Sequence, residues 1–194
     1  MAPIEEAAQS ADPYRGSEYL AVYDRWTREA RIYRGFDVEL IAAATYKTAA
    51  FREAYAEEYG RVFLLSDAER AKLDQDQRVA AEQYHDFLLA AFVPDKKWND
   101  FDKRDSVWKL YLTTDGQKHL DALEIRRIRK VDAATHHFYP SVTPWKVVYR
   151  IRFPRVYPET GEPVIGINDT SVSLVLTGVQ GKTAMLWQLD SQKP

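Results

Sequence analysis

The second half of the chain consists of short segments in which apolar and polar residues alternate. The clearest of them ends at Pro154 and carries apolar side chains at every second position: Trp145, Val147, Tyr149, Ile151 and Phe153. A period of two is typical of a β-strand with one buried face. Because such segments follow one another without helices between them, we expect antiparallel strands, since parallel neighbours need long crossover connections.

The start of the chain has helical spacing instead. Ser17 can cap a helix whose apolar stripe includes Tyr23 and Trp26. A strand pattern follows between residues 36 and 44, and Gly35 beside it indicates a bulge. We therefore predict one helix in front of the first strand.

Residues 48–82 are predicted to form a helical insertion after this first strand. Aromatic residues from Phe51 to Tyr59 recur at four-residue steps, which places them on one face of a helix, whereas Arg52 is expected to face water. Ser66 and Glu69 match a capping box at the start of a second helix.

These patterns together predict a mainly β fold with a helical insertion (α+β). About seven short strands match an antiparallel immunoglobulin-like β-sandwich, with one helix in front and the insertion after the first strand. We predict a single domain over residues 17–194. A flexible leader is predicted over residues 1–16, which are small, polar and acidic and include Pro3 and Pro13.

The composition excludes several kinds of chemistry. The absence of cysteine among 194 residues excludes disulfides, thiolate metal centres and cysteine nucleophiles. A formal net charge of −2 gives no general attraction to nucleic acid, so we expect no nucleic-acid partner. No apolar run approaches the roughly 20 residues that cross a bilayer, so no transmembrane segment is expected.

Catalytic signatures are missing as well. None of the common nucleophile, phosphate-loop, zinc-protease or dinucleotide motifs occurs in the chain, and the glycines at 178–181 are typical of a hairpin turn. His136 and His137 are adjacent, and neighbours in a strand point to opposite faces. His85 lies in an apolar segment, where a structural role is more common than that of a general base. We therefore predict no catalytic residue, no cofactor and no metal site.

Exposed aromatic and basic residues are the candidates for a contact surface. Trp98 lies in a charged segment without apolar neighbours, and the loop from residue 138 to 145 concentrates further rings. The predicted contact residues are Trp98, Phe138, Tyr139, Trp145, Arg150 and Arg152. The alternative is that the rings pack against the end of the sandwich.

The basic residues of the second half could bind an external partner or pair with acidic residues of the same molecule. The densest basic cluster comprises Arg126, Arg127, Arg129 and Lys130, and Arg150 and Arg152 share one face of a strand. Such a face could meet an acidic polymer or lipid headgroups. Because the chain is close to neutral overall, we favour pairing with acidic residues of its own insertion.

Several segments of the chain resemble a known group of proteins. They are Asp24 to Arg31, Ala44 to Tyr46, Phe51 to Tyr55, Thr143 to Trp145, and Leu176 to Gly178 with Trp187. These segments resemble uncharacterised envelope lipoproteins of Gram-negative bacteria. The resemblance implies an outer-membrane location and a lipid anchor upstream of the sequence given, and it implies no role for any residue.

The predicted function is that of a non-enzymatic binding or assembly module with a protein partner in the cell envelope. We place it on the periplasmic face of the outer membrane, with a cytoplasmic location as the alternative. One alternative function is a small-molecule or lipid-binding protein whose site lies between the helical insertion and the sheet. Another is a hydrolase whose catalytic residues are dispersed along the sequence. A deep pocket with converging polar groups would favour the ligand-binding alternative.

Overall fold

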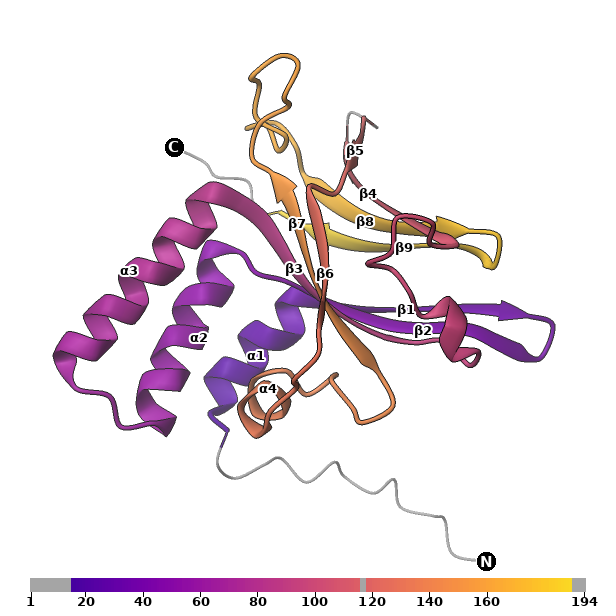
Figure 1. Cartoon of the computed structure of the whole chain (residues 1–194). Coiled ribbons are helices and arrows are strands. Elements are labelled where there is room, and N and C mark those ends of the chain that lie inside the picture. Colours follow the sequence, from indigo (N-terminus) through magenta and orange to yellow (C-terminus); the bar gives the residue numbers. More distant parts are fainter. Residues whose placement is uncertain (1–14, 116–117, 190–194) are drawn as a thin grey trace, which may run out of the picture.

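A computed structural model of the chain describes residues 15–115 and 118–189 (Figure 1). Apart from its last two residues, the leader predicted over residues 1–16 lies outside the described residues. The described part is a mixed α+β fold with two antiparallel sheets.

The first sheet has five strands in the order β1-β2-β3-β7-β6, and every neighbouring pair is antiparallel. Its strands are β1 (Thr27–Arg34), β2 (Asp37–Tyr46), β3 (Tyr84–Phe92), β6 (Glu124–Ile128) and β7 (Val147–Pro154). The expected strand at residues 145–153 is therefore β7, which begins two residues later and extends to Pro154.

The second sheet has four strands in the order β5-β4-β8-β9, again all antiparallel. Its strands are β4 (Trp108–Thr114), β5 (His119–Asp121), β8 (Ser171–Gly178) and β9 (Gly181–Gln188). Gly178 pairs with Gly181 across the β8–β9 turn, so the predicted hairpin is confirmed.

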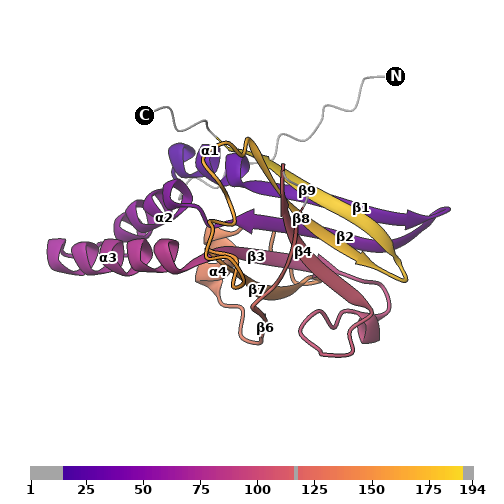
Figure 2. The same cartoon turned by 90° about the horizontal axis from the view of Figure 1, so that it is seen from above.

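Figure 2 shows the two sheets from above. Large apolar side chains from both sheets belong to one buried core. Phe87 of the first sheet and Trp187 of the second are fully buried, and their ring centroids lie 5.3 Å apart. At one margin β9 lies beside β1, where the Arg28 Nε donates to the carbonyl of Leu186 at 2.9 Å. The Trp187 indole N–H donates to the carbonyl of Trp26 at 2.8 Å. These contacts join the sheets to the end of the first helix.

Four α-helices and one short 3-10 helix complete the described part of the fold. They are α1 (Ser17–Trp26), α2 (Ala49–Val62), α3 (Asp67–Gln83), the 3-10 helix Lys96–Trp98 and α4 (Ala133–Phe138). Helices α1, α2 and α3 gather at one side of the sheets, at the left in Figure 1. The capping box of Ser66 and Glu69 at the start of α3 is confirmed.

Rings from three helices hold this helical layer together. Tyr19 of α1 and Phe51 of α2 lie 6.2 Å apart, and Tyr55 of α2 lies 4.9 Å from Phe138 of α4. The Tyr19 hydroxyl donates to the carbonyl of Phe138, which satisfies that polar group inside the cluster. The aromatic side chains predicted to lie on one face of α2 thus pack against α1 and α4.

Two expectations about the first strand were wrong. The alternating residues belong to β2, which pairs with the unpredicted strand β1 before it, so the helical insertion follows the second strand and not the first. Gly35 lies in the turn between the two strands with φ +62°, a left-handed conformation that suits glycine. The irregularity in pairing occurs between Ile32 and Tyr33. With β1 and the short β5, the described residues form nine strands where about seven were expected.

His136 and His137 were considered as neighbours in a strand, but their segment forms the helix α4. Asp132 caps this helix, because its carboxylate accepts from the backbone N–H of Thr135 at 2.8 Å. Arg52, expected to face water, is only 3% exposed.

Candidate functional site

A cleft of about 630 Å³ opens where the end of the first sheet, the start of α2 and the loop between β7 and β8 meet. Its apolar wall includes Trp26, Ala81, Ile165, Ile167 and Leu189. Polar residues enter from the two strand ends and the loop: Tyr46, His85, Arg155 and Asp169. The cleft therefore lies between the helical insertion and the sheets.

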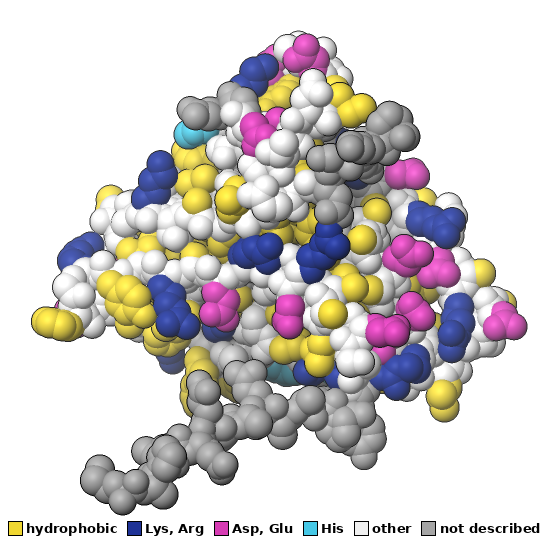
Figure 3. Space-filling view, turned by 180° about the vertical axis from the view of Figure 1, so that it is seen from behind, with side chains coloured by type: hydrophobic (Ala, Val, Ile, Leu, Met, Phe, Trp, Pro, Cys, Tyr) yellow, Lys and Arg dark blue, Asp and Glu magenta, His cyan; other side chains and the backbone are white. Residues whose placement is uncertain are grey.

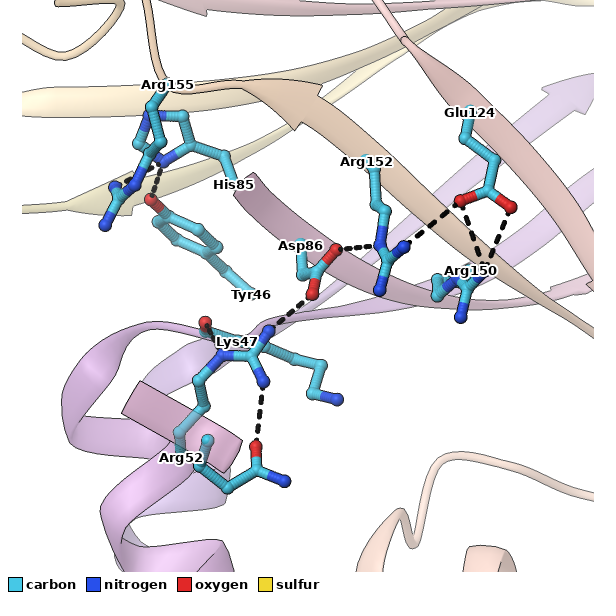
Figure 4. Close-up of polar contacts among 10 residues, drawn as sticks. Tyr46, Lys47, Arg52, His85, Asp86, Glu124, Arg150, Arg152 and Arg155 are labelled. Carbon is cyan, nitrogen blue, oxygen red and sulfur yellow. Dashed lines mark hydrogen bonds and ion pairs between the residues drawn. The ribbon is translucent and has the colours of Figure 1, made fainter. Parts of the chain in front are cut away.

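Strand pairing brings the polar residues of the cleft together. Tyr46 ends β2 and is paired with Phe87, so that His85, two residues earlier on β3, points to the same face of the sheet. His85 is paired with Phe153, and Arg155 follows two residues later. The three side chains meet at the end of the core between the sheets (Figure 4).

His85 accepts hydrogen bonds at one ring nitrogen. The Tyr46 hydroxyl donates to His85 Nδ1 at 2.7 Å, and Arg155 Nη1 donates to the same atom at 3.0 Å (Figure 4). Because Nδ1 is an acceptor, the neutral ring carries its proton on Nε2. No partner for this Nε2–H occurs within residues 15–115 and 118–189. Burial and, secondarily, Arg155 lower the pKa of His85 to about 3, so the ring is neutral at physiological pH.

The start of α2 adds two backbone donors. Thr48 caps the helix, because its side chain accepts from the N–H of Phe51 at 3.2 Å and its carbonyl accepts from Arg52 at 2.9 Å. The amides of Ala49 and Ala50 are left without a partner inside the helix, and both residues line the cleft. The helix dipole places partial positive charge at the same point.

The balance of polar groups in the cleft favours donors. Arg155, His85 and the first residues of α2 all line the cleft and carry N–H groups that can donate. Asp169 is the single acidic residue among the described residues that line the cleft, and its carboxylate accepts from the N–H of Gly166 at 2.7 Å. Trp26, 6% exposed, also lines the cleft, and its buried indole N–H has no acceptor in the part of the chain described. Such a site matches an anionic group attached to an apolar body.

The opposite face of the same strands carries a buried charge cluster. Asp86 follows His85 in β3 and points the other way, where it accepts from Arg52 of α2 and, at 2.9 Å, from Arg152 Nε (Figure 4). Arg152 and Arg150 both reach Glu124 on β6, Arg150 at 2.9 Å. Asp86 and Arg52 are each 3% exposed.

This cluster fastens the helical insertion to the first sheet. Besides Asp86, Arg52 donates to the carbonyl of Lys47 at 3.1 Å and to the side chain of Gln77 on α3 at 2.8 Å. The bonds of one arginine thus link β3, the end of β2 and both helices of the insertion. Since α2 begins at the cleft, the cluster also fixes the position of the cleft's backbone donors.

Lys47 adds a further charge at this point. Burial and the neighbouring Arg52 lower the pKa of Lys47 to about 8, against the opposing effect of Asp86. With Lys47, the cluster contains more basic than acidic side chains, because Arg52, Arg150 and Arg152 share only Asp86 and Glu124 as acidic partners.

The predicted contact residues separate into buried and exposed positions. Phe138 and Tyr139, expected on an exposed loop, are 1% and 6% exposed because they belong to the aromatic layer of the helices. Trp98 is partly buried against the core, and its carbonyl accepts from the indole of Trp108 at 2.8 Å. Trp145 is 77% exposed.

The predicted arginines are paired within the molecule. Arg150 and Arg152 bind Glu124 and Asp86. The favoured alternative of internal pairing therefore holds for them, although the acids lie on β6 and β3 and not in the insertion. The four residues of the dense basic cluster at 126–130 are all exposed.

Sequence reasoning did not select Tyr46, Arg155 or the start of α2, and it assigned His85 a structural role. These groups lie far apart in the chain: Tyr46 and His85 are 39 residues apart, and His85 and Arg155 are 70 residues apart. The local features of the sequence that point to this site are a polar residue at each strand end and Thr48 as a helix cap. Neither signal reveals the convergence.

Comparisons with protein-family models, curated proteins and solved structures gave no match. Within the two described ranges, no group of three or more His, Asp or Glu residues converges on a possible metal site. Among the helices of those ranges, none combines the length and apolar character needed to cross a bilayer.

Proposed function

We propose that this protein binds a small amphipathic anion in the cleft between its helical insertion and its sheets, and that it acts as a binding protein and not as an enzyme. The observation that carries the proposal is the convergence of Arg155, the His85 Nε2–H and the amides of Ala49 and Ala50 on one cleft with apolar walls. A carboxylate on an aliphatic chain has the matching chemistry, because the head needs donors and the chain needs apolar contact.

The state of His85 supports a binding role over catalysis. A general base at neutral pH works best with a pKa near the operating pH. The pKa of His85 is lowered to about 3, and its Nδ1 already accepts two hydrogen bonds. The imidazole is therefore suited to orienting an anion and unsuited to removing a proton.

Calorimetric titration of the whole chain with octanoate tests the proposal. We expect saturable binding of octanoate and none of octylammonium, which carries the same chain with a cationic head. Arg155→Gln should weaken octanoate binding about tenfold or more, because a hydrogen bond to a charged group contributes about 1.5–3 kcal/mol. Arg104→Gln, at an exposed position outside the cleft, is the matched control and should bind as the unchanged protein does.

Equal weakening by both substitutions, or equal binding of octanoate and octylammonium, would contradict an anion site at Arg155. Saturable binding that Arg155→Gln leaves unchanged would place the ligand elsewhere. Thermal unfolding of each variant shows whether the fold is intact.

The location of the protein and its relation to known folds stay predictions. An envelope location on the periplasmic face of the outer membrane and an upstream lipid anchor are proposals from the resemblance. An immunoglobulin-like arrangement of the two antiparallel sheets is a proposal from the alternating pattern of the short strands. Mass spectrometry of the N-terminus of the protein isolated from its native cells tests the anchor. A lipidated cysteine upstream of the sequence given would support it, and an unprocessed Met1 would contradict it.

A further inference from the structure

The edge strand of the first sheet carries the exposed basic cluster. β6 pairs with β7 on one side only, and it is the last strand in the order of that sheet (Figure 1). An edge strand presents backbone N–H and C=O groups on its outer side that another extended chain can pair with. Arg126 and Arg127 lie within β6, and Arg129 and Lys130 follow it.

These four side chains are not used inside the molecule. Each is exposed, and none makes an ion pair or a side-chain hydrogen bond with any residue in the ranges 15–115 and 118–189. In this they differ from Arg150 and Arg152 on the neighbouring strand, which are paired with acids. The free charges are therefore available to a partner.

Two grooves flank the end of β6. One, of about 350 Å³, is lined by Lys96, Arg127, Arg129, Lys146 and the exposed Trp145. The other, of about 790 Å³, is lined by Arg126, Arg127, Arg129, Lys130 and Arg150. Asp102 is the single acidic residue among the described residues that line the two grooves.

On the face of the molecule that Figure 3 shows, charge is not segregated in this way. The formal net charge of the chain is −2. Figure 3 shows the molecule from behind, and there basic and acidic side chains are interspersed. The basic residues that line the two grooves beside β6 are complementary to a strongly acidic partner, although the chain as a whole carries a small negative charge.

We propose that the edge of β6 binds an extended acidic peptide segment of a partner protein, which adds a strand to the first sheet. The backbone of the peptide pairs with the outer side of β6, its carboxylates meet Arg126, Arg127 and Arg129, and Trp145 packs against an apolar side chain at one end. A nucleic acid or a lipid surface could use the charges but not the free backbone groups of the strand. The free strand edge is the observation that favours a peptide.

Fluorescence anisotropy with the whole chain tests this inference. The probe is a fluorescein-labelled peptide of three Thr-Glu-Glu repeats. A second peptide of the same sequence is N-methylated at its three central residues, which keeps the charge but prevents those residues from donating backbone hydrogen bonds. We expect the methylated peptide to bind about tenfold more weakly, as the loss of main-chain pairing requires. Equal binding of the two peptides would overturn strand addition.

Matched variants locate the site on the surface. Arg127→Glu with Arg129→Glu should weaken binding of the unmethylated peptide about tenfold or more, because two attractive contacts become repulsive. Lys72→Glu with Lys109→Glu makes the same change in net charge at two exposed positions on α3 and β4, and it should leave binding within about twofold. If the glutamate variant does not fold, as judged by circular dichroism, Arg127→Gln with Arg129→Gln replaces it. Equal weakening of peptide binding by the two double variants would overturn the assignment of the binding site to β6.

A single-stranded thymidine oligonucleotide of twelve nucleotides is the competing probe. Displacement of the peptide by the oligonucleotide at a lower concentration than by unlabelled peptide would overturn the inference and indicate general polyanion binding. Binding at β6 is independent of the cleft. Arg155→Gln is therefore expected to leave the peptide affinity unchanged.

Discussion

The neutral state of His85 predicts a specific dependence of stability on pH. Burial lowers the pKa of this imidazole from 6.5 to about 3 in the folded protein. Between these two values the unfolded chain binds a proton that the folded chain does not bind. The contribution of His85 therefore leaves stability unaffected above pH 6.5 and reduces it progressively as the pH falls from 6.5 toward 3.

The size of this effect follows from the same two pKa values. Each pH unit below 6.5 costs about 1.4 kcal/mol, so the loss at pH 4.5 is about 2–3 kcal/mol. His85→Gln removes the titration while leaving a side-chain carbonyl that can accept from Tyr46 and Arg155. At pH 7 the variant should be less stable by about 1 kcal/mol, since its hydrogen bonds fit less well. At pH 4.5 the order should reverse.

Urea unfolding followed by tryptophan fluorescence measures both proteins at pH 7.0 and pH 4.5. Other titrating groups are common to the two proteins, so the difference between their free energies of unfolding isolates His85. We expect that difference to shift by about 2–3 kcal/mol in favour of the variant on acidification. A difference that stays constant within about 0.5 kcal/mol would refute a buried neutral His85.

Three further substitutions test other parts of the structure. Lys47→Met should stabilise the protein by about 2 kcal/mol at pH 7 in urea unfolding, and by less at pH 10. The lowered pKa of Lys47 makes its charge costly in the folded protein below about pH 8, and this cost disappears as the pH rises toward 10.5. An equal gain at both pH values would contradict this. Asp86→Ala should destabilise by about 3–5 kcal/mol, since Arg52 would stay buried without its carboxylate, and a loss below about 1 kcal/mol would show that the pair is not isolated from water. Leu64→Gly should stabilise the protein by about 0.5 kcal/mol in the same assay, because Leu64 lies between α2 and α3 in a left-handed conformation (φ 52°) that favours glycine, and its side chain is 87% exposed. Destabilisation by this substitution would contradict backbone strain at Leu64.

Elements that depend on local pattern were predictable from the sequence. The capping box at Ser66, the hairpin at Gly178 and the antiparallel pairing of the second half all follow from a few neighbouring residues. The limits of the helical insertion were predicted within one residue, because residues 48–82 enclose both periodic segments and α2 and α3 span Ala49–Val62 and Asp67–Gln83.

Features that depend on distant partners were not predictable in the same way. Arg52 is an ordinary polar position on a helix face until Asp86, 34 residues away, accepts from it inside the protein. Gly35 was predicted to form a bulge because the alternating segment of residues 36–44 begins directly after it, and the strand before it, β1, was not predicted. The exposure expected for Phe138 and Tyr139 was wrong, because helices α1 and α2 cover them.

The candidate site is the extreme case of this limit. Its donors come from the end of β2, the start of β3, the loop after β7 and the first turn of α2, and none of these segments carries a motif. The sequence did support a site between the insertion and the sheet as an alternative. The residues that form such a site became apparent only from the strand register.

Nuclear magnetic resonance of the whole chain during titration with octanoate tests the anion cleft most directly. Two sets of signals report on it: the imidazole nitrogens of His85 and the backbone amides of Ala49 and Ala50. The account predicts that both sets shift together and saturate at one octanoate concentration, with His85 protonated at Nε2 throughout. Saturable shifts elsewhere in the protein while these signals stay unchanged would contradict it.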